Sequence, residues 1–292
     1  MTPHPLPSAS AHQSSLTPDW KRWGSKTYIM GILNVTPDSF SDGGQFASLD
    51  RAIAQAQQMV QDGADLIDIG GESTRPQAAP VSLEEELQRV IPVIQALRQG
   101  SAAIATPISI DTTKAAVAQA AVAAGATLVN DVSGGTYDAA MLSTVAQLGV
   151  PIVLMHLRGT PQTMQQLTDY DDVVDDIIHV LQARANAAIA AGITPDNIIL
   201  DPGIGFAKTH EQNLDILRHI PRLRALGYPL LIGPSRKRFI GDILNQPDPQ
   251  QRVWGTSAAC CAAIAHHADI LRVHDVAEMA DVCRVADAIW RV

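Results

Sequence analysis

The chain has 292 residues, enough for one large domain; (β/α)8 barrels commonly span about 250 residues as one unit. Hydrophobic residues make up 46% and charged residues 17%, so a sizeable core is feasible and a disordered chain is excluded. The formal net charge of −9 excludes a broadly basic face, so we expect no nucleic-acid partner. An anionic ligand would have to be held by a local cluster of donors.

The N-terminal stretch does not predict a packed structure. Residues 1–23 are rich in Pro, Ser and His and lack periodicity, so we expect a flexible tail followed by one domain over 24–292. The tail lacks the features of a signal peptide, and no run approaches 18 apolar residues, so we expect a cytoplasmic protein without membrane contact. Cys260, Cys261 and Cys283 form no C-x-x-C pair and are interpreted as small buried side chains in a reducing compartment.

From Thr27 onward, short β-branched runs alternate with Ala-rich stretches of helical spacing. Strands are expected at residues 27–35, 65–71, 108–112, 128–132, 152–156, 198–202, 230–235 and 270–275. Helices are expected at residues 48–61, 82–98, 114–123, 138–148, 171–190, 211–226, 250–267 and 276–289. Eight strands that alternate with eight helices predict parallel β/α units.

The ends of the expected strands distinguish a closed barrel from an open sheet. Nearly every strand ends in polar residues: Asn34, Asp68, Asp111, Asn130 with Asp131, His156, Asp201, Ser235, and His274 with Asp275. A barrel brings all eight strand ends to one mouth, whereas an open sheet concentrates function at a single switch point. No G-x-G-x-x-G or P-loop pattern is present. We therefore predict an α/β protein with the (β/α)8 TIM-barrel fold.

Two loops at the predicted mouth are longer than a barrel needs. Residues 36–47 are rich in Asp, Ser and Gly, and residues 73–81 hold Arg75 and two prolines. Long polar loops above a barrel mouth are interpreted as candidate lids.

The strand-end residues fall into two groups of opposite character. Asn34, Asp111, Asn130 and Asp201 are acceptor-rich side chains aimed at one cavity, so they require a ligand with several N–H donors or a cation. A flat heterocycle with a donor-rich edge and a metal ion both fit. The second group follows strands seven and eight, a frequent phosphate site in barrels: Arg236, Lys237, Arg238, Arg272 and His274.

Eight motifs resemble those of the dihydropteroate synthase family from Thr27 to the C-terminus. They are MGILNVTPDSFSDGG (from Met30), DIGGESTRP (from Asp68), SIDT (from Ser109), NDVSGG (from Asn130), LMH (from Leu154), LDPGIGFAK (from Leu200), GPSRKRFIG (from Gly233) and RVHD (from Arg272). The resemblance implies condensation of 6-hydroxymethyl-7,8-dihydropterin diphosphate with 4-aminobenzoate to give 7,8-dihydropteroate and pyrophosphate. It also implies a binding site that sulfonamide mimics of 4-aminobenzoate target and assembly as a homodimer.

The resemblance further implies roles for individual residues. Asp201 is expected to bind the amino-pyrimidine edge of the pterin, with Asp111 and Asn130 beside it, and Lys237 to reach the pterin carbonyl and ring nitrogen. The other pterin-binding residues are expected to be Val132, Met155, Phe206, Gly233 and Arg272. The diphosphate is expected at Asn34, Arg272 and His274, with Mg²⁺ as cofactor and Asn34 as its ligand. Asn34, Lys237, Arg272 and His274 are the expected catalytic residues.

The 4-aminobenzoate half of the site is expected to involve the two long loops. Its expected residues are Phe40, Asp42, Thr74, Arg75, Pro76, Phe206 and Arg238. The carboxylate of this substrate would favour the N-terminus of the segment after Lys237. Two other functions stay open: a methyltransferase-type pterin-binding barrel, which has no need for Arg236–Lys237 or the TPDSFSDGG loop, and a non-catalytic paralogue, which should have lost charged residues from the mouth.

Overall fold

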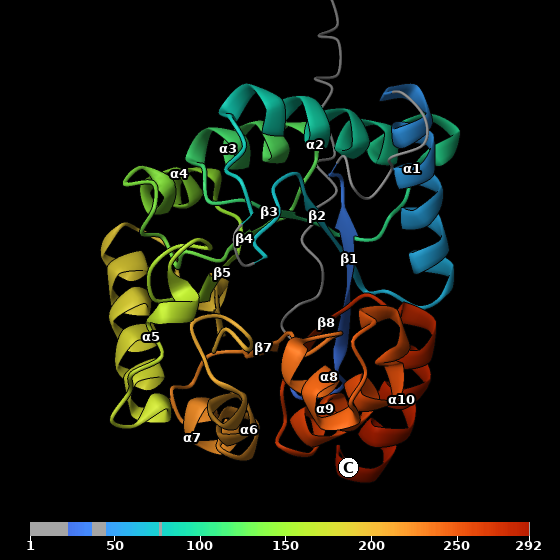
Figure 1. Ribbon diagram of the computed structural model, residues 1–292. Helices are drawn as coiled ribbons and strands as arrows, with labels where there is room; N and C mark the ends of the chain where they lie inside the picture. The colour runs from blue at the N-terminus through green and yellow to red at the C-terminus, as the bar shows by residue number, and fades with distance from the viewer. Residues whose placement is uncertain (1–22, 37–44, 76–77, 292) are drawn as a thin grey trace, which may run out of the picture.

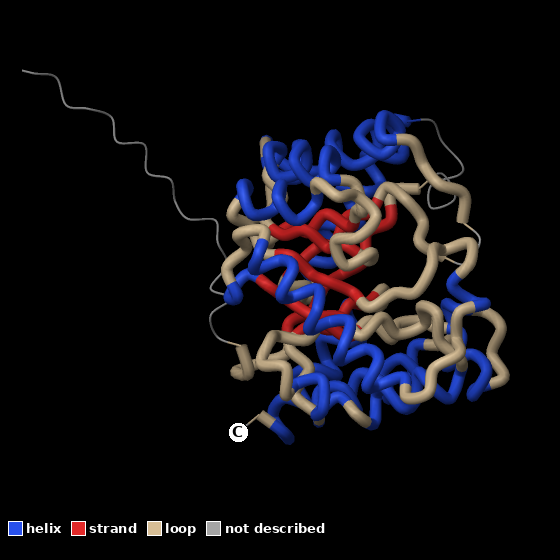
Figure 2. Tube along the Cα trace, turned by 90° about the vertical axis from the view of Figure 1, so that its left-hand side faces the viewer, coloured by secondary structure: helices blue, strands red, loops and turns tan. Residues whose placement is uncertain are grey.

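A ring of parallel strands surrounded by helices forms the body of the protein, as the two views in Figure 1 and Figure 2 show. The computed structural model describes residues 23–36, 45–75 and 78–291. Nearly all of the tail expected at residues 1–23 therefore lies outside the described residues, as do residues 37–44 of the first long loop and residues 76–77 of the second.

Eight strands make up the barrel. They are β1 (Tyr28–Asn34), β2 (Leu66–Gly70), β3 (Ile108–Asp111), β4 (Leu128–Asp131), β5 (Ile152–Met155), β6 (Ile198–Asp201), β7 (Leu231–Ile232) and β8 (Ile270–Val273). The strands pair in the order β6-β5-β4-β3-β2-β1-β8-β7, and every ladder is parallel. A single bridge between Leu200 and Leu230 joins β6 to the start of β7 and closes the ring. The predicted TIM barrel is confirmed.

The helices alternate with the strands along the chain and cover the outside of the ring (Figure 1). They are α1 (Gln45–Gln61), α2 (Leu83–Arg98), α3 (Ala115–Ala124), α4 (Met141–Leu148), α5 (Val173–Ala190), α6 (His210–Arg218), α7 (Ile220–Arg224), α8 (Arg238–Leu244), α9 (Val253–Ala265) and α10 (Val276–Trp290). None of the helices formed by the described residues combines the length and the apolar character that crossing a membrane requires.

Three elements differ from the expected ones, and prolines account for two of the differences. The single helix expected at 211–226 is divided at His219 into α6 and α7, because Pro221 lacks the N–H that a continuous helix would need there. The strand expected at 230–235 is limited to Leu231–Ile232, because Pro234 has no N–H to donate to a neighbouring strand. The short helix α8, which begins at Arg238, was not expected from the sequence.

An apolar cluster fills the N-terminal end of the barrel interior. Its buried members, from every strand except β3, are Met30, Leu66, Leu128, Val153, Ile199, Leu231 and Ile270. Trp23 and Tyr28 pack against this cluster, and their rings meet edge to face with centroids 5.4 Å apart. Because this end of the barrel is filled, a ligand can enter the interior only at the C-terminal ends of the strands.

Candidate active site

Arg272 lies at the centre of the C-terminal mouth. Its Nε donates to Oδ2 of Asp68 at 2.6 Å, and its Nη2 donates to Oδ2 of Asp111 at 2.6 Å. The Asn130 amide donates to the same oxygen of Asp68 at 3.0 Å. Burial alone would lower the pKa of the Arg272 guanidinium, but the two carboxylates raise it. Residues from β2, β3, β4 and β8 thus form one charged network across the mouth.

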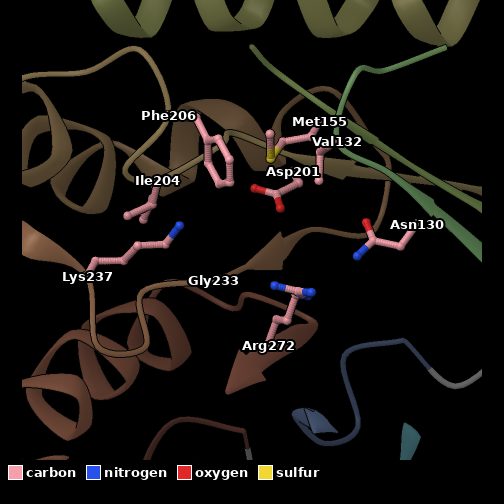
Figure 3. A pocket seen from close by; sticks show the side chains of 9 residues that line it. All are labelled: Asn130, Val132, Met155, Asp201, Ile204, Phe206, Gly233, Lys237 and Arg272. Atoms are coloured by element: carbon pink, nitrogen blue, oxygen red, sulfur yellow. The ribbon is translucent and has the colours of Figure 1, made fainter. Parts of the chain in front are cut away.

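A cavity opens beside this network, and Figure 3 shows side chains from several strand ends around it. Its lining residues are Asn130, Val132, Met155, Asp201, Ile204, Phe206, Gly233, Lys237 and Arg272. Eight of these nine were expected to bind the pterin, and Ile204 was not. Asp111, the other expected pterin residue, reaches the cavity through its bond to Arg272.

Asp201 is the acidic side chain of the cavity. Its Oδ1 accepts a hydrogen bond of 2.7 Å from the backbone N–H of Gly203. Burial raises the pKa of Asp201 to about 6, although the Gly203 bond and the positive charges of Lys237, Arg272 and Lys208 oppose this shift. At neutral pH the carboxylate is therefore mainly ionised, and Figure 3 shows it among the side chains that line the cavity, where it could accept from a donor-rich ligand.

Lys237 enters the cavity from the turn before α8. Its Nζ lies 4.1 Å from the centroid of the Phe206 ring, a cation–π contact. Burial, together with Arg272, lowers the pKa of Lys237 to about 8. The turn after β6 passes so close that a Cβ on Gly205, whose φ is +83°, would lie 2.8 Å from Cδ of Lys237. Glycine at position 205 therefore makes room for the lysine.

His274 and Ser235 form the corner expected to bind the diphosphate. Ser235 Oγ accepts the backbone N–H of His274 at 3.1 Å and lies 3.0 Å from its Nδ1. Burial lowers the pKa of His274 to about 3, helped by the positive charges of Arg236, Arg272, Lys237 and Arg75, so the ring is neutral. Since the hydroxyl can donate its own hydrogen to Nδ1, the ring proton resides on Nε2, where it can be donated to an anion.

The other basic residues near the mouth have different environments. Arg236 forms a two-bond ion pair with Asp275, so much of its charge is compensated within the protein. The Arg238 side chain is 90% exposed and lies 3.9 Å from Asp242, outside the cavity lining. Arg75 is exposed, and Thr74 is half-buried. Lys237 and Arg75 add positive charge around His274, together with Arg272, whose own charge is balanced in part by Asp68 and Asp111.

Asn34 ends β1, and its half-buried side chain forms no hydrogen bond with other described residues. Its amide oxygen is therefore available to a hard cation such as magnesium. Over the described part of the chain, no group of three or more His, Cys, Asp or Glu side chains could hold a metal. An ion at Asn34 would need its other oxygen ligands from a diphosphate and water, which suits a metal that arrives with the substrate. Phe40, Asp42 and Pro76 lie outside the described residues.

The sequence interpretation missed several residues behind the cavity. Asp68 and His156 were noted as polar strand ends, but neither was assigned to the site. Lys208 was read only as part of the LDPGIGFAK motif, although it is 5% exposed and contacts His156. Arg252 is also buried and donates to the carbonyls of Arg236 and Lys237 at 2.9 and 3.4 Å, which fixes the turn that carries Lys237. A lysine directly after a strand-end glycine turn was the one signal that could have pointed to Lys208.

Comparisons with known proteins agree with this geometry. Residues 30–274 match a family described as pterin binding enzymes. A dihydropteroate synthase from a Synechocystis species is 61% identical over 269 residues, which cover 92% of each chain. The structure of Xanthomonas albilineans dihydropteroate synthase with 4-aminobenzoic acid is 47% identical, covers 92% of this chain and 95% of that one, and superposes with a TM-score of 0.85.

A second structure of the Xanthomonas albilineans enzyme is a complex with 7,8-dihydropteroate. It is 45% identical, covers 92% of this chain and 95% of that one, and has a TM-score of 0.83. Both the fold and most of the chain length are thus shared with these enzymes. The chain belongs to the dihydropteroate synthase family of pterin-binding enzymes.

Proposed function

We propose that the mouth of this barrel joins 6-hydroxymethyl-7,8-dihydropterin diphosphate to 4-aminobenzoate, giving 7,8-dihydropteroate and pyrophosphate. Membership of the family supports the reaction. The observation that carries it is the cavity itself, which sets the Asp201 carboxylate beside Lys237 and Arg272, with the neutral His274 near them. An acceptor for the pterin edge and donors for the diphosphate therefore meet at one mouth.

The pterin would bind at the deep end of the cavity. Its amino-pyrimidine edge presents two parallel N–H donors, which match a carboxylate, so Asp201 would accept both. Lys237 would donate to the ring carbonyl, while Met155, Val132 and Phe206 would contact the faces of the ring. Asn130 would complete the polar edge, its orientation fixed by the bond to Asp68.

The bond to diphosphate would break before the amine attacks. The reacting carbon is a methylene attached to an electron-rich dihydropterin ring, which spreads the positive charge that develops when the leaving group departs. Arg272 and the Nε2–H of His274 would stabilise the departing negative charge, an electrostatic contribution preorganised by Asp68 and Ser235. The amine nitrogen of 4-aminobenzoate would then form the new C–N bond, and its proton would pass to the released pyrophosphate.

Magnesium is the proposed cofactor, with the Asn34 amide oxygen as its protein ligand. When bound, the ion would neutralise part of the diphosphate charge. The chain's own contribution is the half-buried Asn34 side chain at the end of β1, which forms no hydrogen bond with other described residues.

Release of pyrophosphate tests the function directly. The protein would be incubated with the pterin diphosphate, with and without 4-aminobenzoate and magnesium, while pyrophosphate and dihydropteroate are measured. We expect both products in equal amounts only when both substrates are present. Transfer of a methyl group from a methylated pterin, without dihydropteroate, would favour the methyltransferase-type alternative, and binding without turnover would favour the non-catalytic one.

The order of binding gives a second test. The 4-aminobenzoate site involves the long loops around Phe40 and Arg75, so it would be complete only after pyrophosphate is bound. We expect 4-aminobenzoate and sulfonamides to bind more weakly to the free protein than to the protein with pyrophosphate and magnesium, because a rarely populated site lowers the apparent affinity. Calorimetric titrations that give equal affinities in both states would contradict this order.

We also propose that the chain forms a homodimer through the flank made by α8, α9 and α10, which pack side by side (Figure 1). Large apolar side chains are exposed there, including Trp254 at 79%, Val285 at 63% and Ile289 at 57%. Sedimentation should give a dimer that Trp254→Glu weakens, and a monomeric wild type would contradict it. The proposed location is the cytoplasm, where the free cysteines Cys260 and Cys283 suit a reducing compartment.

A further inference from the structure

A buried polar network lies behind the wall of the pterin cavity. Lys208 Nζ donates to the carbonyl oxygen of Phe206 at 2.8 Å and to Nδ1 of His156 at 3.0 Å. On the other side of its ring, His156 donates from Nε2 to Oδ2 of Asp176 at 3.0 Å, and Arg158 donates to Oδ1 of the same carboxylate at 2.5 Å. His156 is completely buried and Lys208 is 5% exposed, so water does not substitute for these bonds.

This network holds the turn after β6, which carries the cavity wall. The Phe206 carbonyl is bound by Lys208, and the next carbonyl, that of Ala207, accepts from the Tyr170 hydroxyl at 2.9 Å. Ala207 adopts a left-handed conformation with φ of +50°, which an L-residue keeps only where its surroundings enforce it. The bonds from Lys208 and Tyr170 therefore fix the backbone from which the Phe206 ring enters the cavity.

The network also connects to Asp201. The backbone N–H of His156 donates to the Asp201 carbonyl at 2.9 Å, so β5 and β6 remain paired up to the cavity. Behind the turn there is no spare room, since a Cβ on Gly203 would lie 2.1 Å from the His156 carbonyl oxygen. A movement of His156 would consequently displace the Gly203 N–H that binds the Asp201 carboxylate.

Lys208 also brings a positive charge into the interior. Removing an ammonium group from water lowers the stability of the fold, and an apolar side chain could fill the same space without this loss. A functional role would explain why a lysine occupies the position. Its charge and that of Asp201 stabilise each other. The charged groups that face Asp201 are Lys208, Lys237 and Arg272, and those that face Lys208 are Asp201, Lys237, Asp176 and Arg158, with the neutral His156 in contact.

We propose that Lys208 is a positioning residue for pterin binding: its hydrogen bond to the Phe206 carbonyl fixes one wall of the cavity, and its contact with His156 supports the strand that pairs with Asp201. The proposal rests on the proposed function, because it concerns the affinity for the pterin. Lys208 acts through Phe206 and Asp201, and it does not line the cavity.

Two variants separate the hydrogen bond from the charge. Lys208→Gln keeps an N–H donor near the Phe206 carbonyl but removes the charge, and Lys208→Met removes both. The measurement is the affinity for 6-hydroxymethylpterin by fluorescence titration between pH 5 and 7.5. In the wild type the affinity should fall below the Asp201 pKa of about 6, because the protonated acid cannot accept both pterin donors.

At pH 6 Lys208 is protonated, since burial lowers its pKa only to about 7. Loss of its charge removes one of the interactions that hold the Asp201 pKa down, so in both variants the loss of affinity at low pH should begin at a higher pH than in the wild type. Above this range the affinity should no longer depend on pH. There, only Lys208→Met should bind the pterin more weakly, by about tenfold, because only this variant loses the hydrogen bond to the Phe206 carbonyl.

Arg224→Met is the matched control. Arg224 pairs with the buried Asp269 at the opposite end of the barrel, so its loss should lower the melting temperature without moving the acidic limb. A wild type that does not bind the pterin would contradict the proposed function. A wild type that binds, together with folded Lys208 variants whose pH profile and plateau are unchanged, would overturn the role of Lys208 alone.

Discussion

At its N-terminal end the barrel buries Met30, Leu128 and Ile270 against one another, whereas at its C-terminal end it buries Asp68, Asp111 and Asp201. Apolar side chains removed from water at the first end stabilise the fold. Charged groups removed from water at the second end do the opposite unless each finds a partner, and even the paired Asp68 leaves Oδ1 without a hydrogen bond among the described residues. Substitutions should therefore affect stability at one end and ligand affinity at the other.

The largest effect should come from Leu128→Ala. Leu128 is fully buried in the apolar cluster, so its truncation leaves a cavity and should lower the free energy of unfolding by about 4 kcal/mol. Urea denaturation measures this loss. Turnover per folded molecule should stay near that of the wild type. A large fall in kcat of the folded variant would contradict the idea that the apolar end serves stability alone.

The next effect in size concerns Asp201→Asn, which keeps the shape of the side chain but replaces one acceptor by a donor. The pterin would lose a charged hydrogen bond and face an opposed N–H, so its binding should weaken by about 3 kcal/mol. Calorimetry with the pterin measures this change. Asp269→Asn is the matched control at the other end: Asp269 is also buried, and its substitution should reduce stability but not pterin affinity.

A smaller effect should appear with pH. Burial raises the pKa of Asp201 to about 6 and lowers that of Lys237 to about 8. Pterin affinity should therefore be highest between these values and should fall by up to about tenfold per pH unit below the first. Titrations from pH 5 to 9 check this window, and Asp201→Asn should abolish the acidic limb. An acidic limb retained in that variant would show that another group causes it.

The smallest effect is expected for Arg238→Ala. Because its side chain is 90% exposed and only 3.9 Å from Asp242, removal should change the KM for 4-aminobenzoate by less than about twofold. Lys237→Ala, one residue earlier, should strongly weaken pterin binding. A tenfold rise in the aminobenzoate KM of Arg238→Ala would show that Arg238 contacts this substrate when the long loops are in place.

The sequence predicts the strands and the mouth well because both follow local rules. A buried parallel strand is a short apolar run, and a polar residue such as Asp111 or Asp201 that ends it must lie at the mouth. Prolines explain where the expectation was wrong: the backbone around Pro221 and Pro234 cannot continue the element, although the hydrophobic pattern continues. Side-chain pairing is harder to predict.

Glu86 illustrates the difficulty. It lies in the acidic first turn of α2, where an exposed side chain would be expected, but it is fully buried and accepts from Thr112 at 2.6 Å and from Lys114 at 2.5 Å. Its partners follow a different strand, so only the three-dimensional arrangement reveals the contact. The same is true of Lys208 and His156, which are 52 residues apart.

The ring closes between β6 and β7, where a single bridge joins Leu200 to Leu230. Asp201 and Phe206 stand on one side of it, and Gly233 and Lys237 stand on the other. A pterin that contacts both sides would link β6 to β7 at the place where a single bridge closes the ring. Its binding should then stabilise the closed barrel as a whole. The amide of Leu200 donates to the Pro229 carbonyl at 2.9 Å beside this bridge. We expect this amide to exchange its hydrogen more slowly when the pterin is bound.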